Sequence, residues 1–153
     1  MGIGSIDTKW LDQEEMGRIV AIGDMELEFE RVRREIAQNA ASRLSCLWVA
    51  EDTEEGKTHI RSMLGSDILI LKVRIPVALR VSKVDTTWLD AYFEEPRQEF
   101  IENYWRSIPF NEQRVTWEYL VDGAIGVNDP EGMECIRRYG AHLRLTSGTI
   151  FPS

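Results

Sequence analysis

Residues 116–127, TWEYLVDGAIGV, are the stretch around which the chain is organised. Their β-branched and aromatic side chains predict a strand that runs into a glycine-containing turn. Strand side chains alternate between two faces, which places Trp117, Tyr119 and Val121 on one face and Thr116, Glu118 and Leu120 on the other. A glutamate on so apolar a strand either lies on a solvated edge or is held in a cleft. The position of Glu118 is therefore the main functional question that the sequence poses.

Patterns on both sides of this stretch predict helices and strands in an irregular order. Asp12 with Glu15, and Asp129 with Pro130, are signals for the start of a helix. We expect helices over 12–23, 24–38, 52–65, after Asp85, after Pro96 and over 130–140, and strands over 42–50, 68–75, 79–84 and 142–145. This order predicts one α+β domain spanning 1–153, with a mixed or antiparallel sheet and flanking helices.

Composition narrows the function classes. The 153 residues carry a formal net charge of -8, which disfavours nucleic-acid binding unless the charge is segregated. No apolar run reaches the length of a membrane-spanning helix, and the first residues do not form a secretory signal. Cys46 and Cys135 lack metal-ligand spacing, and Cys46 lies in an apolar pattern typical of a reduced core thiol. We therefore expect a cytoplasmic protein that does not bind membranes.

Familiar catalytic and metal-binding motifs are absent. The acidic run over 51–56 resembles a calcium loop, but Ser62 stands where the closing glutamate belongs, and the run is explained by the start of a helix. His59 and His142 stand alone and are interpreted as surface or strand histidines. We therefore predict no metal site.

A set of separated residues remains as the candidate site. It comprises Ser42, Arg43, Trp48, Tyr104, Trp105 and Glu118. An arginine can clamp a diphosphate, aromatic faces can stack on a flat cation such as nicotinamide, and a carboxylate can stabilise a cationic sugar transition state. Composition and spacing alone favour a structural interpretation, in which the aromatic residues form the core, Arg43 caps a helix and Glu118 pairs with an arginine.

Four segments resemble a bacterial family of uncharacterised domains grouped with the ADP-ribosyltransferase-like fold. They are residues 29–34 followed by SRLSCLWV at 42–49, Tyr104-Trp105, and EYLVDGAI at 118–125. The resemblance implies a curved β core that binds NAD in a cleft, with Glu118 as the catalytic residue. Ser42 and Arg43 would lie near the NAD phosphates or ribose, and the aromatic residues near the cleft wall.

The implied activity is transfer of ADP-ribose from NAD to a protein or nucleic acid, or hydrolysis of NAD. The chain departs from the family's pattern because nothing before residue 25, including the segment 2–6, supplies the early His or Arg that grips the NAD ribose. The alternative prediction is a non-catalytic interaction or neutralising partner protein with the same fold.

Overall fold

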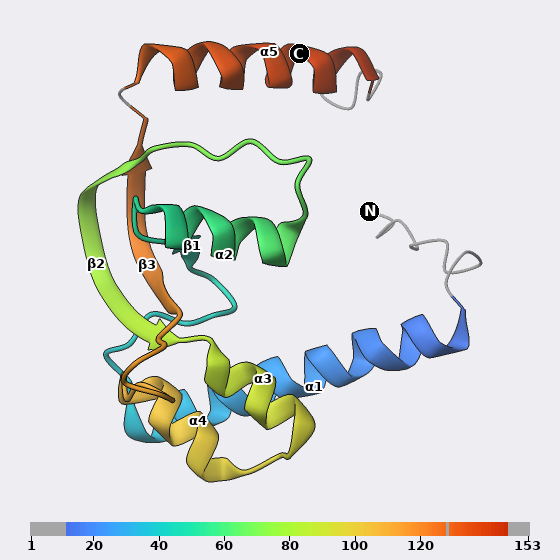
Figure 1. Cartoon of the computed structure of the whole chain (residues 1–153), viewed down its shortest axis with the longest axis vertical. Coiled ribbons are helices and arrows are strands. Elements are labelled where there is room, and N and C mark those ends of the chain that lie inside the picture. Colours follow the sequence, from blue (N-terminus) through green and yellow to red (C-terminus); the bar gives the residue numbers. More distant parts are fainter. Residues whose placement is uncertain (1–11, 128, 147–153) are drawn as a thin grey trace, which may run out of the picture.

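The computed structural model describes residues 12–127 and 129–146 (Figure 1). The segment 2–6, in which an NAD-gripping residue was sought, lies outside the described residues. The described elements are α1 (Gln13–Ile36), β1 (Leu47–Val49), α2 (Glu54–Leu64), β2 (Arg74–Asp85), α3 (Thr87–Glu94), α4 (Gln98–Trp105), β3 (Trp117–Gly126) and α5 (Pro130–Thr146). The described part of the chain is thus α+β, as predicted.

The sheet is antiparallel and has β3 at its centre. Its strand order is β1-β3-β2, and β3 pairs antiparallel with both neighbours. Trp48 lies opposite Leu120 in one pairing, and Ser82 opposite Leu120 in the other. Directly opposed residues of antiparallel strands share a face. The stretch 116–127 therefore organises the sheet, as the sequence predicts.

The long ribbon of β2 and β3 is strongly curved (Figure 1). The pairing register shifts between Arg74 and Val77 and again between Ala78 and Arg80, where β2 carries extra residues. Such bulges bend a strand and increase its twist. Gly123 lies at the second bulge, and a Cβ atom there would stand 2.3 Å from the carbonyl oxygen of Val77. Only glycine permits this close approach.

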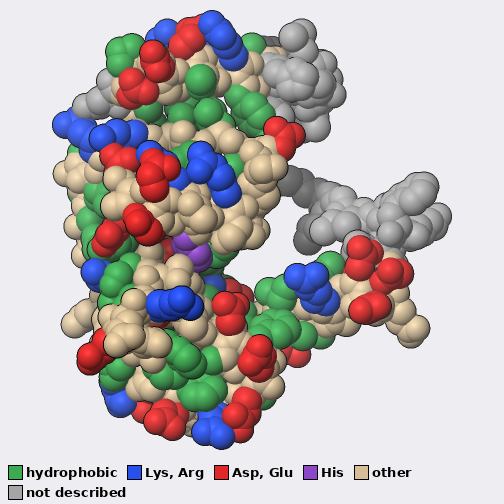
Figure 2. Space-filling model, in the orientation of Figure 1, with side chains coloured by type: hydrophobic (Ala, Val, Ile, Leu, Met, Phe, Trp, Pro, Cys, Tyr) green, Lys and Arg blue, Asp and Glu red, His purple; other side chains and the backbone are tan. Residues whose placement is uncertain are grey.

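The core lies between one face of the sheet and the helices α1, α3 and α4. Its completely buried members include Phe29, Val32, Val84, Ile101 and Leu120. Cys46, a free thiol, packs against this core as predicted. Acidic and basic side chains are interspersed over the surface shown in Figure 2. None of the described helices has the length and apolar character needed to cross a bilayer.

Several helix boundaries follow the predicted signals. Asp12 and Glu15 form the capping box, and α5 starts at Pro130 with the Asp129 carboxylate accepting from the Gly132 N–H at 2.8 Å. The helix α2 ends at Gly65, whose φ is +90°. The Asp85 carboxylate accepts from the N–H of Thr87 at the start of α3.

Other predicted boundaries are wrong. Gln13–Ile36 forms one helix and not two, because a glycine inside a helix is tolerated and nothing redirects the chain at Gly23. The strand predicted over 42–50 is only Leu47–Val49, because β1 pairs with three residues of β3. The strand predicted over 142–145 is the last part of α5.

The predicted central strand over 68–75 is also wrong. Strand pairing starts at Arg74, which lies opposite Gly126 at the end of β3, so residues 68–73 have no strand to pair with. β2 then continues through Pro76, which the sequence suggested as a boundary. Proline is accepted there because β2 is an edge strand, where a missing N–H need not break a ladder bond.

Candidate functional site

Glu118 is buried in the middle of the fold. It lies on β3 opposite Val84 of β2, and 4% of its side chain is exposed. Its Oε2 atom is buried without a hydrogen-bond partner among the described residues. Of the two positions that the sequence left open for this glutamate, the structure excludes the solvated edge. A buried carboxylate without a full set of partners is costly, and such groups gather at functional sites.

His59 on α2 is the residue nearest to Glu118 for which the structure gives a direct contact. Its Nε2 lies 3.4 Å from Oε1 of Glu118, and 13% of its side chain is exposed. The ring is directed there by the start of α2, where the Thr53 hydroxyl accepts from the Gly56 N–H. Gly56 itself passes so close to Glu51 that an added Cβ would lie 2.1 Å from the Glu51 carbonyl oxygen. His59 is therefore a partly buried helical residue, which corrects its interpretation as a surface or strand histidine.

Burial and charge act on Glu118 in opposite directions. Burial raises the pKa of the carboxyl group, whereas the nearby Arg43 and His59 lower that pKa. Burial has the larger effect, so the pKa of Glu118 is raised from its ordinary value. Glu118 therefore retains a proton to higher pH than an exposed glutamate does.

Arg43 is held by three side chains from three elements. Its Nε and Nη2 donate to the two carboxylate oxygens of Glu26 on α1 at 2.8 and 2.6 Å, and its Nη1 donates to the hydroxyl of Tyr104 on α4. Its guanidinium lies over the Trp48 ring, 4.2 Å from the centroid. Only 3% of the Arg43 side chain is exposed. Every guanidinium nitrogen is thus directed at a protein partner.

These residues define the buried polar cluster, which consists of Glu26, Arg43, His59, Tyr104 and Glu118. Of the six predicted site residues, Arg43, Tyr104 and Glu118 belong to it, and Trp48 and Trp105 pack against its members. The structure therefore places Arg43 near enough to Glu118 to lower the pKa of its carboxyl group, but neither residue lines the cleft described below, which the NAD interpretation expected them to share. It also gives Arg43 and Tyr104 the structural contacts that the other interpretation expects.

The hydrogen bonds of Ser42 and Trp105 go to partners outside the buried polar cluster. The Ser42 hydroxyl donates to Glu30 at 2.8 Å, in a second ionic group on α1. The Trp105 indole N–H donates to the carbonyl oxygen of Phe29 at 2.9 Å, and its ring packs edge-on against Tyr104. Both contacts join parts of the core, and the NAD-binding roles of Ser42 and Trp105 remain predictions.

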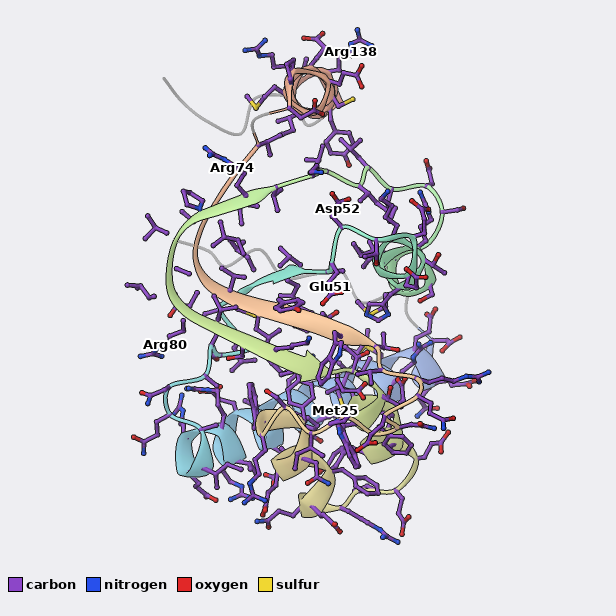
Figure 3. All side chains as sticks on the ribbon, turned by 60° about the vertical axis from the view of Figure 1, so that its left-hand side comes forward. Met25, Glu51, Asp52, Arg74, Arg80 and Arg138 are labelled. Atoms are coloured by element: carbon purple, nitrogen blue, oxygen red, sulfur yellow. The ribbon has the colours of Figure 1, made fainter. Side chains whose placement is uncertain are left out.

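A cleft of about 490 Å³ opens beside the buried polar cluster. We call it the α2–β3 cleft because its walls are the first two turns of α2 and the start of β3. Its lining includes His59, Trp117, three glutamates and four hydroxyl-bearing residues, the latter being Thr53, Thr58, Ser62 and Thr116. Glu51, which Figure 3 shows with Asp52 in the turn leading from β1 into α2, is one of the three glutamates. His59 thus stands between the cleft and Glu118.

The sequence interpretation did not single out Glu26 or His59 as site residues. Glu26 precedes Phe29 by three positions on α1, and His59 precedes Met63 by four positions on α2, so helical periodicity places each beside an apolar residue. That signal could have identified Glu26 as a polar group at the edge of a buried face, whereas Met63 is exposed and marks no buried face beside His59. Within 12–127 and 129–146, no three His, Cys, Asp or Glu side chains converge as a metal site.

Comparison with known proteins places this chain in a family that is described without an activity. Residues 12–135 match DUF2441, described as a protein of unknown function. No curated protein matches the chain. The matched range includes all three strands and the whole buried polar cluster. The chain belongs to the DUF2441 family.

Proposed function

We propose that this domain cleaves the nicotinamide–ribose bond of NAD in the α2–β3 cleft, passing the ADP-ribose to water or to a macromolecular acceptor. An ADP-ribosyltransferase-like fold is part of the proposal, and the antiparallel curved sheet supports it at a coarse level. One observation carries the proposal, namely that the buried Glu118 contacts His59 at the wall of a cleft.

Cleavage of NAD releases neutral nicotinamide and leaves positive charge on the ribose. A fixed carboxylate near that position lowers the energy of the cationic transition state. The attacking water or acceptor then loses one proton, which the Glu118 carboxylate takes up. Arg43 supports this role as a buried cation that favours the ionised form of Glu118. Because Arg43 already binds Glu26, clamping of the diphosphate would need Arg43 to exchange partners.

NAD binding and nicotinamide release test this function. Wild-type protein should be stabilised by NAD in thermal unfolding and should release nicotinamide, because a ligand that binds the folded state raises its stability. Glu118→Gln should lower the release rate by about 10²- to 10³-fold, the usual effect of removing one electrostatic stabiliser.

The matched control is Glu28→Gln, which alters an exposed carboxylate of α1 outside the cleft and should retain the wild-type rate. Wild-type protein that neither binds NAD nor releases nicotinamide would contradict the proposal, as would full activity of Glu118→Gln.

A second function remains proposed, that of a non-catalytic interaction or neutralising partner. It is favoured by the saturation of Arg43 by Glu26 and Tyr104, and by the net charge of -8, which suits contact with a basic surface. The same thermal-unfolding experiment separates the two functions, because this partner protein would gain no stability from NAD.

A further inference from the structure

The β1 side of β3 is open at the start of the strand. β1 pairs with β3 only from Tyr119 to Val121. The chain then leaves the sheet through the turn that contains Glu51 and Asp52 and enters α2 (Figure 3). On the opposite side of β3, β2 remains paired as far as Trp117. The first residues of β3 therefore have a neighbouring strand on one side only.

The unpaired backbone groups at this edge are those of Trp117. The Thr86 N–H donates to the carbonyl oxygen of Thr116 at 3.1 Å, so the backbone groups of Thr116 point toward the β2 side. Successive residues of an antiparallel strand direct their N–H and C=O groups to opposite edges, which turns those of Trp117 away from β2. Neither group of Trp117 has a hydrogen-bond partner among residues 12–127 and 129–146. A strand edge with free donors and acceptors is a template for a further strand.

This edge lines the α2–β3 cleft. Val115, Thr116 and Trp117 form one wall, and the cleft volume of about 490 Å³ is typical of ligand-binding pockets. Behind the lining, Nε2 of His59 and Oε2 of Glu118 are buried without a hydrogen-bond partner in the described part of the chain. The Glu118 side chain is 4% exposed and is directed at His59, which belongs to the lining. The cleft thus combines an open strand edge with buried polar groups whose hydrogen bonds are unmade.

The wall formed by α2 and the turn before it is acidic. Glu51, Glu54 and Glu55 line the cleft, and its lining contains no lysine or arginine. Two lysines lie just outside: Lys57 pairs with Glu54 at 2.7 Å, and the Lys83 Nζ lies 3.8 Å from a carboxylate oxygen of Glu51. Glu55 is exposed and has no ion-pair partner among the described residues. Three carboxylates therefore face two lysines, and the excess negative charge lies at Glu55.

We propose that the α2–β3 cleft binds an extended, basic peptide segment of a partner protein. The segment adds beside Trp117 in the position that β1 vacates, and its backbone hydrogen bonds provide the affinity. Every second side chain of an extended segment points the same way, so a lysine or arginine can be placed against Glu55. This gives the interaction function proposed above a surface and a class of partner, and it does not require NAD.

Binding of defined peptides, measured without NAD by fluorescence anisotropy, tests the proposal. The probe is a labelled short peptide of alternating threonine and lysine, which should bind at micromolar concentrations and bind more weakly as salt is added. The same peptide with glutamate in place of lysine should not bind. A third peptide, methylated on its backbone nitrogens, keeps the lysine charges but cannot donate to a strand edge, and it should lose most of the affinity.

Glu55→Lys should weaken binding of the lysine peptide at least about fivefold, because it replaces an attraction with a repulsion. The matched control is Glu94→Lys, which makes the same change of net charge at an exposed position of α3 outside the cleft. This control should retain the wild-type affinity. Both glutamates are exposed, so both variants should keep the fold, which circular dichroism checks.

Amide hydrogen exchange locates the bound peptide. The Trp117 N–H should become protected when the lysine peptide binds, because it gains a hydrogen-bond partner. Absence of lysine-peptide binding, equal binding of the acidic or methylated peptide, equal weakening by Glu55→Lys and Glu94→Lys, or an unchanged Trp117 amide would overturn the proposal. Nicotinamide release by the wild-type protein is measured separately, so failure of peptide binding and failure of NAD cleavage are distinguishable.

Discussion

Glu26→Gln should lower the free energy of unfolding by much more than so small a change of side chain usually does. The substitution keeps the size of the side chain and one carbonyl oxygen, but it removes the charge that faces Arg43. In the wild-type protein the two groups form a paired contact with nitrogen–oxygen distances of 2.8 and 2.6 Å. After the substitution, a guanidinium with a 3% exposed side chain loses its opposite charge.

The expected loss of stability follows from that burial. Breaking a buried ion pair from one side costs about 3–5 kcal/mol, and the remaining amide oxygen of glutamine places this variant near the lower limit. Glu28→Gln is the matched control on the same helix, since Glu28 binds Arg31 in an exposed pair. Exposed pairs contribute about 0–1 kcal/mol.

Urea unfolding followed by circular dichroism measures the difference. With a denaturant dependence of about 2 kcal/mol per molar, Glu26→Gln should lower the midpoint by about 1.5 M and Glu28→Gln by less than about 0.5 M. Equal midpoints for the two variants would refute the reasoning. They would mean that Arg43 finds another partner, such as Glu118, at no cost, and that Glu26 does not fix its position.

Three further predictions concern single substitutions. Glu30→Gln should lower the free energy of unfolding by about 2–3 kcal/mol at neutral pH, because contact chiefly with Arg33 lowers the pKa of Glu30 to about 2. The stabilisation that Glu30 gives is present above its ordinary pKa of 4.5 and is lost as pH falls through 2. The urea midpoints of variant and wild type should therefore converge in acid. Glu118→Gln should gain stability relative to wild type as pH rises from 4.5 through the raised pKa of Glu118, since the folded wild type binds the proton more tightly there; a difference in midpoint that is constant with pH would refute this. Gly123→Ala should lower the free energy of unfolding by more than about 2 kcal/mol in thermal unfolding through backbone displacement at Val77, whereas Gly17→Ala, with open space around it, should raise this free energy by up to about 1 kcal/mol.

Local chemistry explains what the sequence predicted correctly. The Asp12 and Asp129 signals act within one helical turn, so their outcome does not depend on the rest of the fold. The alternation that joins Glu118 with Leu120 on one face is likewise a property of the strand itself, and both side chains are buried.

Long-range pairing explains most of what the sequence did not predict. Residues 68–73 have the side chains of a strand, but β3 is too short to pair with them. Glu26 and His59 come from different helices, and neither sequence neighbourhood indicates that the residue joins Arg43 and Glu118 in one cluster. Tertiary packing decides which helix contacts Glu118. The residue pattern of a single segment carries no information about that packing.

The two bulges of β2 have a consequence for the behaviour of the chain in concentrated solution. A regular, flat edge strand offers a continuous row of N–H and C=O groups to any other strand, and this is a route to aggregation. On β2 that row is interrupted at both register shifts, and Pro76 removes one donor from it. Arg80 and Lys83 add repulsion between like edges. The irregularities that bend the sheet therefore also protect an apolar ribbon from lateral growth.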